Sequence, residues 1–543
     1  MRDHVWAVGA LLLLTAISFL HFPGHTYLQS DTQIYVPILE RLWDPSVFTK
    51  DIIAQKPHVA FTMYDEVTLG LRKITGLGTR ETLLGLQIVF RFGALLGVYL
   101  FALTLGQGRT AALLVAACFG LGATIIGPSV LVVEYEPNPR TNAIALVMLA
   151  TGLIAQRRHL WGGVAAGAAF LYHVPAVYPF WLAYFVLSLI PSAPDVMRRR
   201  IRGLLPMAGA VLILLLLSQL QPGVEEKQEF FARIDDGLEK MMRERASYNW
   251  ISMWQGAFIG HHLFYAAALC GAWWRLRKLL DRDVRILVAL MPAIGLLSMP
   301  ASYLLLERMK WTLMPQLQPM RALLYVVAFS VILTCSAGVV AARSKRWVEA
   351  LAWFLVAFSP ASHTRTVSVL TDWGPNGYQS AALTVIAIAG VVTAASVSRK
   401  AWAALLIAAV LPYWALPALA KVRNYPPLHH AELDELSAWA RGNVARDAVF
   451  LFPDAGKTLV PGVFRATSLR AVFVDWKGGG QVNFMREFMK VWQPRWRTAL
   501  LPGFQGALAH YRQFDVDYLV LGKPLAGEQP VFRNRLYFVY KIR

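Results

Sequence analysis

Asp31 is the first residue whose type and position suit chemistry. It lies a few residues beyond the first apolar segment, and residues 34–43 after it place apolar and aromatic side chains, Tyr35 among them, at helical spacing. A helix with one apolar face lies flat on a membrane surface. The sequence therefore predicts a catalytic carboxylate held at the bilayer surface by an interfacial helix, with Tyr35 as a candidate for contacting the substrate.

A second group of charges lies between two apolar segments. Glu134 and Glu136 are two residues apart, so their carboxylates point to the same side of an extended turn and could share a divalent cation such as Mg²⁺ or Mn²⁺. Pro137 and Pro139 stiffen the turn and carry Arg140 into the start of the next helix. The chemical interpretation is a catalytic or metal-binding pair, and the alternative is an ordinary polar connection.

His173 and Arg321 are candidates for binding a phosphate, together with Arg140. His173 lies in the turn between two short apolar segments, where an imidazole suits contact with a phosphate or transfer of a proton. Its alternative role is a structural hydrogen bond. Arg321 begins an apolar helix near the outer leaflet, where a guanidinium suits bidentate capture of phosphate oxygens. The alternative for Arg321 is anchoring to lipid headgroups.

The composition describes a polytopic membrane protein. Of the 543 residues, 56% are hydrophobic and 16% are charged, and the mean hydropathy is +0.45, which is too apolar for a soluble enzyme of this length. The net charge of +20 comes mostly from short basic clusters between apolar segments, so it does not indicate nucleic acid as a partner. The three cysteines all lie in apolar segments, so nothing points to a disulfide framework.

About 13 segments are apolar enough to cross a membrane, and the first is expected to be retained rather than cleaved. They are residues 5–22, 83–105, 110–132, 141–155, 160–173, 176–190, 203–220, 256–274, 285–306, 321–341, 347–361, 380–397 and 401–420. Basic clusters fall at every second connection, at 108–109, 156–159, 198–202, 275–278, 343–346 and 398–400. This alternation makes those connections cytoplasmic and places the candidate residues on the outer side.

Two domains are predicted. Residues 1–420 form a transmembrane domain with a long first outer loop, 23–82, and residues 421–543 form a small extracytoplasmic α/β domain. In the outer loops, amphipathic stretches are expected at 34–43 and 62–74, and a charged helix at 225–245. In the C-terminal domain, a helix is expected at 432–440 and strands at 448–452, 471–474, 517–521 and 535–540.

This organisation resembles the GT-C membrane glycosyltransferases, which use polyprenyl-phosphate-linked sugars. The resemblance rests on a short cytoplasmic start, one helix, a long first outer loop with Asp31 near its beginning, about a dozen further spans and an outer C-terminal domain. It implies that Asp31 acts as a base or a metal ligand. It also implies that Glu134 and Glu136 correspond to the acidic pair that helps to hold a divalent cation in oligosaccharyltransferases. Arg321 would correspond to an arginine that binds the lipid phosphate.

The chain departs from two branches of that superfamily. Oligosaccharyltransferases carry a Trp-Trp-Asp-Tyr-Gly acceptor motif in the C-terminal domain, where residues 474–480 of this chain read Val-Asp-Trp-Lys-Gly-Gly-Gly. Glycosylation of asparagine sequons is therefore not implied. Protein mannosyltransferases carry an Asp-Glu pair in the first loop, but Asp31 is followed by Thr32. The C-terminal part instead resembles that of uncharacterised bacterial members.

The predicted function is transfer of a sugar from a polyprenyl-phosphate-linked donor to an envelope glycan, lipid or protein, with inversion, at the outer face of a bacterial cytoplasmic membrane. Two other classes stay open. A transporter or flippase of a lipid-linked saccharide would explain the spans and the charges, although no inverted repeat is visible. A non-catalytic assembly protein for an envelope polysaccharide is the third class.

Overall fold

The structure is a computed structural model that describes residues 2–20, 24–55, 62–220, 232–362, 378–396, 404 and 428–543. The chain is mostly helical and forms two compact units. The first unit consists of Met1–His25, Leu84–Leu216 and Tyr248–Pro426, and the second of Thr26–Leu83, Leu217–Ser247 and Pro427–Arg543. The domain boundary expected at residue 420 lies outside the described residues, and it stays a prediction.

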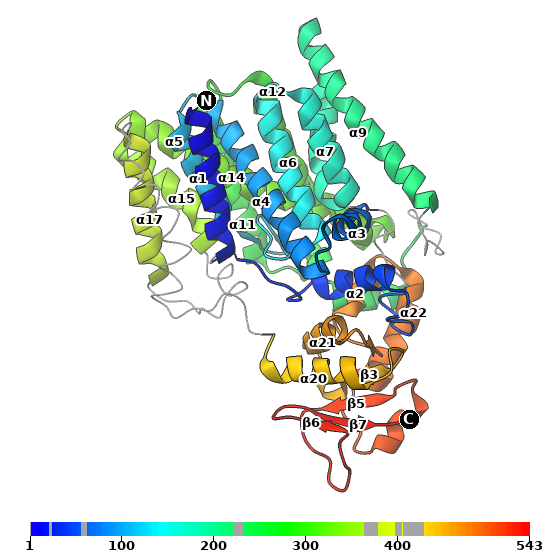
Figure 1. Cartoon of the computed structure of the whole chain (residues 1–543). Coiled ribbons are helices and arrows are strands. Elements are labelled where there is room, and N and C mark those ends of the chain that lie inside the picture. The colour runs from blue at the N-terminus through cyan, green and yellow to red at the C-terminus, as the bar shows by residue number, and fades with distance from the viewer. Residues whose placement is uncertain are drawn as a thin grey trace. The chain divides into compact units, whose positions relative to one another are not determined.

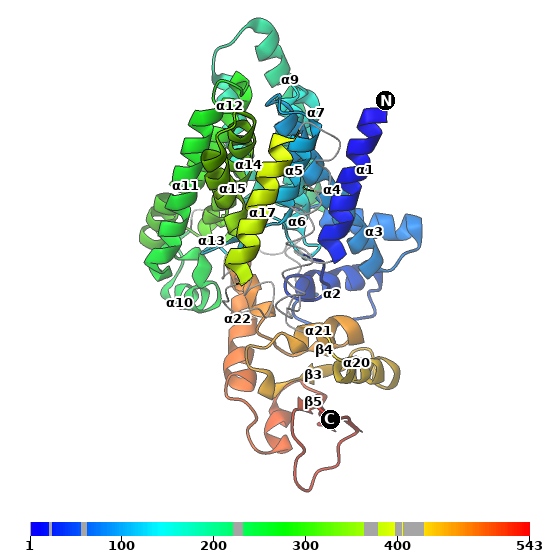
Figure 2. The ribbon, with the colours of Figure 1, turned by 90° about the vertical axis from the view of Figure 1, so that its left-hand side faces the viewer.

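The first unit is a bundle of helices (Figure 1). Its main helices are α1 (Arg2–Leu20), α4 (Thr79–Leu103), α5 (Arg109–Gly120), α6 (Pro139–Ala155), α7 (His159–Tyr172), α8 (Val174–Leu189), α9 (Pro194–Leu220), α11 (Gly256–Leu276), α12 (Arg282–Ser302), α14 (Leu323–Arg343), α15 (Trp347–Ser362) and α17 (Tyr378–Ala395). Short elements join them: β1 (Thr124–Ile125), β2 (Val130–Leu131), η2 (Ser247–Asn249), η3 (Ile251–Met253), η4 (Tyr303–Arg308), α13 (Leu313–Leu317) and η5 (Pro319–Ala322). Figure 2 shows α14 packed beside α11, α12 and α15.

The helices are those of a multi-pass membrane protein. Among the described residues, four are long and apolar enough to cross a bilayer: Thr79–Leu103, Pro194–Leu217, Arg282–Arg308 and Leu313–Arg343. Shorter apolar helices cover Val5–Phe19, Arg109–Gly120, Pro139–Ala155, Val174–Leu189, Trp347–Ala361 and Leu383–Ala395. The expected count of about 13 spans is not reached by these helices and stays a prediction. The span expected at 401–420 lies outside the described residues, apart from residue 404.

The expected span 110–132 is wrong. Its helix α5 ends at Gly120, and the chain continues as a hairpin in which β1 pairs antiparallel with β2. Gly122 and Gly127 have φ angles of +70° and +99°, which other residues adopt at a cost. The side chain of His262, on α11, contacts the carbonyl oxygen of Ile126 at 2.8 Å and holds the hairpin in place. The hairpin leads directly into the connection that carries Glu134.

The two ends of the first unit carry different groups of charged and titratable residues. At one end, Arg200 of α9 makes two hydrogen bonds to the Asp283 carboxylate of α12, at 2.6 and 3.0 Å, with His159 of α7 at 3.5 Å from the same carboxylate. His159 and Asp283 lie in the first turns of α7 and α12, and Arg200 in the second turn of α9, at the end that carries the predicted cytoplasmic clusters. Because α6, α8 and α14 run in the opposite direction, their first residues lie at the other end of the bundle. That end carries Arg140, His173 and Arg321.

The second unit combines loop helices with the C-terminal domain. Its helices are α2 (Thr32–Trp43), α3 (Tyr64–Thr75), α10 (Asp236–Arg245), α20 (Ala431–Asn443), α21 (Val460–Ser468) and α22 (Arg486–Arg495), with short turns η7 (Pro453–Ala455), η8 (Gly478–Asn483), η9 (Trp496–Leu500) and η10 (Leu508–Gln513). Its strands are β3 (Val449–Leu451), β4 (Ala471–Val472), β5 (Tyr518–Leu521), β6 (Phe532–Arg533) and β7 (Phe538–Lys541). They form one sheet in the order β4-β3-β5-β7-β6, parallel at β4-β3-β5 and antiparallel beyond.

Local patterns predicted most of these elements. The amphipathic stretches expected at 34–43 and 62–74 are α2 and α3, and the expected C-terminal helix is α20. The four expected strand regions contain β3, β4, β5 and β7. The charged helix expected at 225–245 is seen as α10, which buries Leu238, Met241 and Met242. Residues 225–231 of that stretch lie outside the described residues.

Candidate functional site

The Glu134 connection is fixed by a buried ion pair. The Arg140 guanidinium donates through Nε to Glu134 Oε1 at 2.7 Å, and the backbone N–H of Leu131 donates to the same oxygen at 3.3 Å. Asn138 caps α6 by accepting a hydrogen bond from the Thr141 N–H at 3.0 Å, which places Arg140 in the first turn of the helix. Two predicted site residues, Glu134 and Arg140, are therefore brought together at the start of α6.

Glu136 is also buried, and its backbone carbonyl accepts a hydrogen bond from the Thr141 hydroxyl at 2.6 Å. The predicted cation was to be shared by Asp31, Glu134 and Glu136. Asp31 belongs to the second unit and the two glutamates to the first, so the shared cation stays a prediction. Among the described residues, no three His, Cys, Asp or Glu side chains gather as a metal site would require. Since the Glu134 carboxylate already accepts a hydrogen bond from Arg140, these residues do not by themselves fit a cation.

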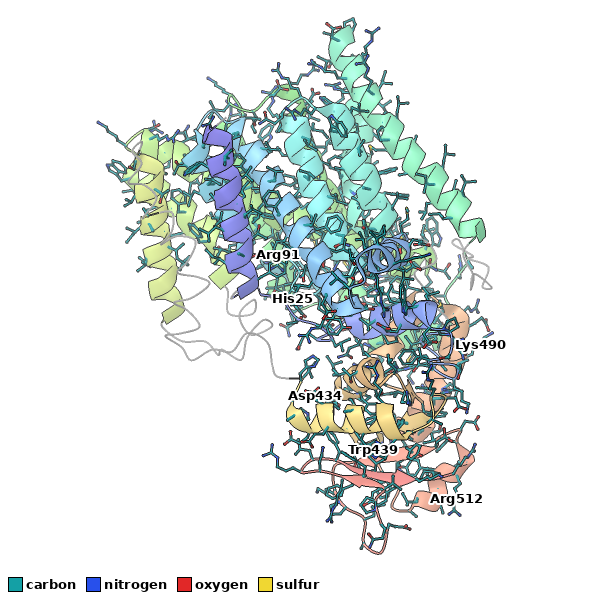
Figure 3. All side chains as sticks on the ribbon, viewed as in Figure 1. His25, Arg91, Asp434, Trp439, Lys490 and Arg512 are labelled. Atoms are coloured by element: carbon teal, nitrogen blue, oxygen red, sulfur yellow. The ribbon has the colours of Figure 1, made fainter. Side chains whose placement is uncertain are left out.

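Arg91 holds the Glu134 connection from the other side, and sequence reasoning missed it. From within α4, its guanidinium donates to the carbonyl oxygens of Glu134, Gly24 and Ser18 at 2.6, 2.9 and 3.1 Å, and it lies 4.1 Å from the centre of the Phe19 ring. Figure 3 labels Arg91 on α4 and His25 just beyond the end of α1. An arginine inside an apolar span is costly, and this is a signal that the sequence did contain. Arg91 therefore joins the end of α1 to the Glu134 connection.

A small cavity lies at this junction. Its polar lining comes from Ser18, Arg91, Glu134 and Thr141, and the rest is apolar residues of α4, α5, α6 and the connection before Glu134. The cavity of about 20 Å³ has room for a single water molecule, so it is too small for a sugar or a phosphate. Arg91 is thus a positioning residue rather than a group that meets substrate.

We expect Arg91→Met to lower the free energy of unfolding by about 3 kcal/mol, because three buried carbonyl groups lose a charged donor. The measurement is the apparent Tm of the full chain in detergent. Arg157→Met is the control, because Arg157 is exposed and its ion pair with Asp281 lies at the surface, where such pairs contribute about 0–1 kcal/mol. Equal Tm values for the two variants would show that Arg91 does not hold the connection.

His173 and Arg321 lie on neighbouring segments of the same end. The His173 imidazole caps α8 by accepting a hydrogen bond through Nδ1 from the Ala176 N–H at 3.1 Å, which is the structural role that the sequence left open. One turn later, the Tyr178 hydroxyl donates to the Pro319 carbonyl oxygen at 2.8 Å. Pro319 begins η5, the turn that contains Arg321. The start of α8 is thereby packed against the turn that begins α14.

Arg321 is a buried cation at the start of an apolar helix. Only 9% of its surface is exposed, and its guanidinium lies 5.9 Å from the centre of the Tyr248 ring. The helix that follows, α14, is buried over nearly its whole length. A guanidinium in such a place is stabilised by hydrogen-bond acceptors or by an anion, and both of its planar edges suit phosphate oxygens.

In the second unit, the C-terminal domain supplies a cation for Asp31. Asp31 precedes α2, and its carboxylate accepts a hydrogen bond from the Lys477 ammonium at 2.7 Å, while Lys477 also donates to the Ser30 hydroxyl at 2.9 Å. The side chains of Asp31 and Lys477 are 29% and 16% exposed. Asp31 is thus a partly accessible, charge-paired carboxylate. On the next turn of α2, the Tyr35 ring lies 5.3 Å from the ring of Tyr64 on α3.

A fully buried ion triad fixes the segment that carries Lys477. Arg465 of α21 donates to the carboxylates of Asp51 and Asp475, at 2.8 and 2.5 Å. Burial alone would lower the pKa of Arg465, but the two carboxylates outweigh it and raise that pKa. The second oxygen of Asp475 accepts from the Gly478 N–H at 3.1 Å, which closes the turn around Lys477. The sequence did not reveal Asp51 or its pairing with Arg465, because these residues are 414 positions apart.

An adjacent Asp-Glu pair does exist in the first long loop, at Asp65 and Glu66, although sequence reasoning considered only Asp31 there. Both residues lie in the first turn of α3, and Asp65 is buried. Burial and the neighbouring Glu66 raise the pKa of Asp65 to about 8. Asp65 therefore differs from Asp31, which is partly exposed and paired with a lysine.

Comparison with known proteins adds a family model and a set of solved structures. Residues 431–499 match a domain family of unknown function, DUF6798, which spans α20 to α22 and includes Arg465, Asp475 and Lys477. Comparison with curated proteins finds no match.

Three solved structures are similar to this chain. The first is the archaeal oligosaccharyltransferase AglB from Archaeoglobus fulgidus in complex with an inhibitory peptide and a dolichol-phosphate; the sequence identity is 12%, the match covers 96% of this chain and 70% of that chain, and the TM-score is 0.45. The second is ArnT from Cupriavidus metallidurans bound to undecaprenyl phosphate, with 13% identity, coverage of 99% of this chain and 97% of that chain, and a TM-score of 0.45. The third is arabinofuranosyltransferase AftD from Mycobacteria, with 12% identity, coverage of 96% of this chain and 37% of that chain, and a TM-score of 0.44. The chain distantly resembles GT-C glycosyltransferases. With TM-scores below 0.5, no residue role, donor or acceptor is taken from these structures.

Proposed function

We propose that this protein is an integral-membrane glycosyltransferase that moves a sugar from a polyprenyl-phosphate-linked donor to an envelope acceptor. The observation that carries the proposal is Arg321, a buried guanidinium at the start of an apolar helix, at the bundle end that also holds Arg140 and His173. A lipid-linked donor carries a phosphate anion within the membrane, where a buried charge needs a partner. Arginine suits this anion because its guanidinium binds phosphate with two parallel hydrogen bonds.

Arg140 and Arg321 are assigned different tasks. Arg140 is held by Glu134, so its charge is balanced within the protein and it keeps the Glu134 connection in place. Arg321 is the candidate for binding the phosphate and for stabilising the charge that develops on it during transfer. His173 keeps its Nδ1 in the cap of α8 and is a further candidate for contacting the phosphate.

Asp31 is the proposed base, and the proposed reaction is a single displacement with inversion of a hexosyl or pentosyl group. Asp31 takes the proton from an acceptor hydroxyl as the hydroxyl oxygen forms a bond to the anomeric carbon. The bond from that carbon to the phosphate oxygen breaks, and the electron pair leaves with the polyprenyl phosphate. Lys477 donates a hydrogen bond to the Asp31 carboxylate at 2.7 Å and so holds it in a fixed direction. Tyr35 is the candidate for contacting the acceptor or the sugar.

The proposed location is the bacterial cytoplasmic membrane, with the candidate residues and the C-terminal domain on the outer side. The support is the distribution of charge in the first unit. Arginine and lysine gather in the connections after α6 and α14 and in the first turns of α9, which follows α8, as they do on the cytoplasmic side of membrane proteins. The other end of α6, α8 and α14 carries the candidate residues.

Binding of undecaprenyl phosphate tests the proposal. We expect Arg321→Met to weaken this binding about 10- to 100-fold, because it removes a charge-assisted hydrogen bond to the phosphate. The measurement is a titration of the full chain in nanodiscs, followed by tryptophan fluorescence. Arg308→Met is the control, because Arg308 is exposed and its guanidinium contacts the Tyr303 side chain at the surface.

The reaction itself is followed by the release of undecaprenyl phosphate from undecaprenyl-phosphate-linked sugars in membranes that contain acceptor. Release that depends on the protein supports transfer. A flippase would move the donor without consuming it, and an assembly protein would do neither. Unchanged binding in Arg321→Met together with no release of lipid phosphate would rule out the proposed function.

A further inference from the structure

Gln318 is a buried side chain whose amide has no hydrogen-bond partner among the described residues. It lies between α13 and η5, only 3% of its surface is exposed, and neither its amide nitrogen nor its amide oxygen has a hydrogen-bond partner within the described part of the chain. A buried amide without partners is costly, because it has given up water on both of its polar atoms. Such a group in a native structure is a candidate for binding a ligand.

The backbone at Gln318 is strained as well. Its φ and ψ angles are 46° and 59°, the left-handed conformation that favours glycine, yet the residue is a glutamine. The strain is maintained by the surroundings, since the Gln318 N–H donates to the Met314 carbonyl at 2.9 Å and the Gln318 carbonyl accepts from the Arg321 N–H at 3.0 Å. Strained residues of this kind cluster at ligand-binding positions.

The neighbourhood of Gln318 is the proposed phosphate site. Arg321 is three residues later in the same turn, and its guanidinium lies over the ring of Tyr248. Next to Tyr248, the buried Asn249 has an amide nitrogen without a hydrogen-bond partner in the described ranges. The turn that begins α14 and the segment that contacts it therefore contain two buried amides with unused hydrogen-bonding atoms.

The chemistry of an amide decides which ligand suits Gln318. A phosphate has only acceptor oxygens, so it would bind the amide nitrogen and leave the amide oxygen without a partner. A sugar carries neighbouring hydroxyl groups, each of which both donates and accepts. One hydroxyl can accept from Gln318 Nε2 while the next donates to Oε1, which satisfies both atoms.

We propose that Gln318 binds two hydroxyl groups of the sugar on the lipid-linked donor and so selects which donor is used. The inference rests on the proposed function, and it adds a specificity-determining residue to it. Arg321 binds the phosphate that all such donors share, whereas Gln318 binds the part that differs between them. A site built to bind a hydroxyl discriminates strongly against donors that lack it, because its own polar groups are then left unpaired.

The test compares bare undecaprenyl phosphate with undecaprenyl phosphate linked to glucose, galactose, mannose or arabinose, each titrated against the full chain in nanodiscs. We expect the wild-type protein to bind at least one sugar-linked lipid about tenfold or more tightly than the bare lipid. In Gln318→Met that ratio should fall to within about twofold, while the affinity for the bare lipid stays within about twofold of wild type. Arg321→Met should weaken both.

Stability separates this role from a structural one. Because the Gln318 amide makes no hydrogen bond within the described residues, Gln318→Met should unfold at the wild-type temperature or above it. Gln318→Gly should also be more stable, since glycine adopts a positive φ without strain. The control is Gln107→Met. Gln107 is buried at the other end of the bundle and donates to the Ser336 carbonyl at 3.2 Å, so its loss should lower the Tm and leave the sugar preference unchanged.

Two results would overturn the inference about Gln318 while leaving the proposed function intact. One is a sugar preference that survives in Gln318→Met, as expected if a water molecule satisfies the amide. The other is a wild-type protein that binds bare and sugar-linked lipids equally while Arg321→Met weakens both. If the wild-type protein binds none of these lipids, the proposed function fails and the inference fails with it.

Discussion

Replacing Arg465 by methionine is expected to lower the free energy of unfolding by about 3–5 kcal/mol, because Asp51 and Asp475 are then left buried without their shared cation. Water cannot take the place of the guanidinium, since all three side chains are buried. A loss of this size corresponds to a fall of roughly 10 °C in the apparent Tm for a unit of this size. The measurement is thermal unfolding of the full chain in detergent, followed by tryptophan fluorescence.

Arg446→Met is the matched control. Arg446 also joins the C-terminal part of the second unit to the first loop, through Asp44 at 3.3 Å, but both side chains are exposed. Surface pairs of this kind contribute about 0–1 kcal/mol. A triple variant with Arg465→Met, Asp51→Asn and Asp475→Asn removes the charges together and should recover part of the loss. Similar Tm values for Arg465→Met and Arg446→Met would contradict the prediction.

Elements that rest on local patterns were predictable from the sequence. The interfacial helix α2 and the C-terminal strands follow from the periodicity of apolar residues, which is a property of neighbouring positions. The break at His173 follows from Pro175, which restricts the residue before it and suits the first turn of a helix. These predictions needed no knowledge of which distant segments meet.

The span 110–132 shows where a local pattern fails. Its residues are apolar because they are buried, and β1 and β2 are buried as fully as a helix would be. Hydropathy alone cannot separate a short buried hairpin from the second half of a membrane helix. The glycines at 120, 122 and 127 were the available signal, since each favours an interruption of the helix.

The candidate site was predictable residue by residue but not as pairs. Asp31, Glu134 and Arg321 stand out because charges are rare next to apolar segments. Their partners do not follow from spacing, since Lys477 is 446 residues away from Asp31. The pair of Glu134 and Arg140 is the exception, because six residues and two prolines keep them on one connection. Gln318 could not be recognised at all, since an amide becomes unusual only when burial leaves it without a partner.

Asp31→Asn is expected to lower the rate of sugar transfer by about 10²- to 10⁴-fold, because the amide cannot accept the proton of the acceptor hydroxyl. The fold should be kept, since asparagine has nearly the same shape and Asp31 makes no capping hydrogen bond to α2. The measurement is release of undecaprenyl phosphate from the sugar-linked lipid, with binding of the bare lipid as the check that the protein is intact.

Asp44→Asn is the control, since Asp44 is an exposed carboxylate at the other end of the same helix. Lys477→Met should cause a smaller loss than Asp31→Asn, because the carboxylate remains but is no longer held by its ammonium partner. Transfer at the wild-type rate in Asp31→Asn would remove Asp31 from the chemistry, whereas equal losses in Asp31→Asn and Asp44→Asn would show that α2 matters only for the fold.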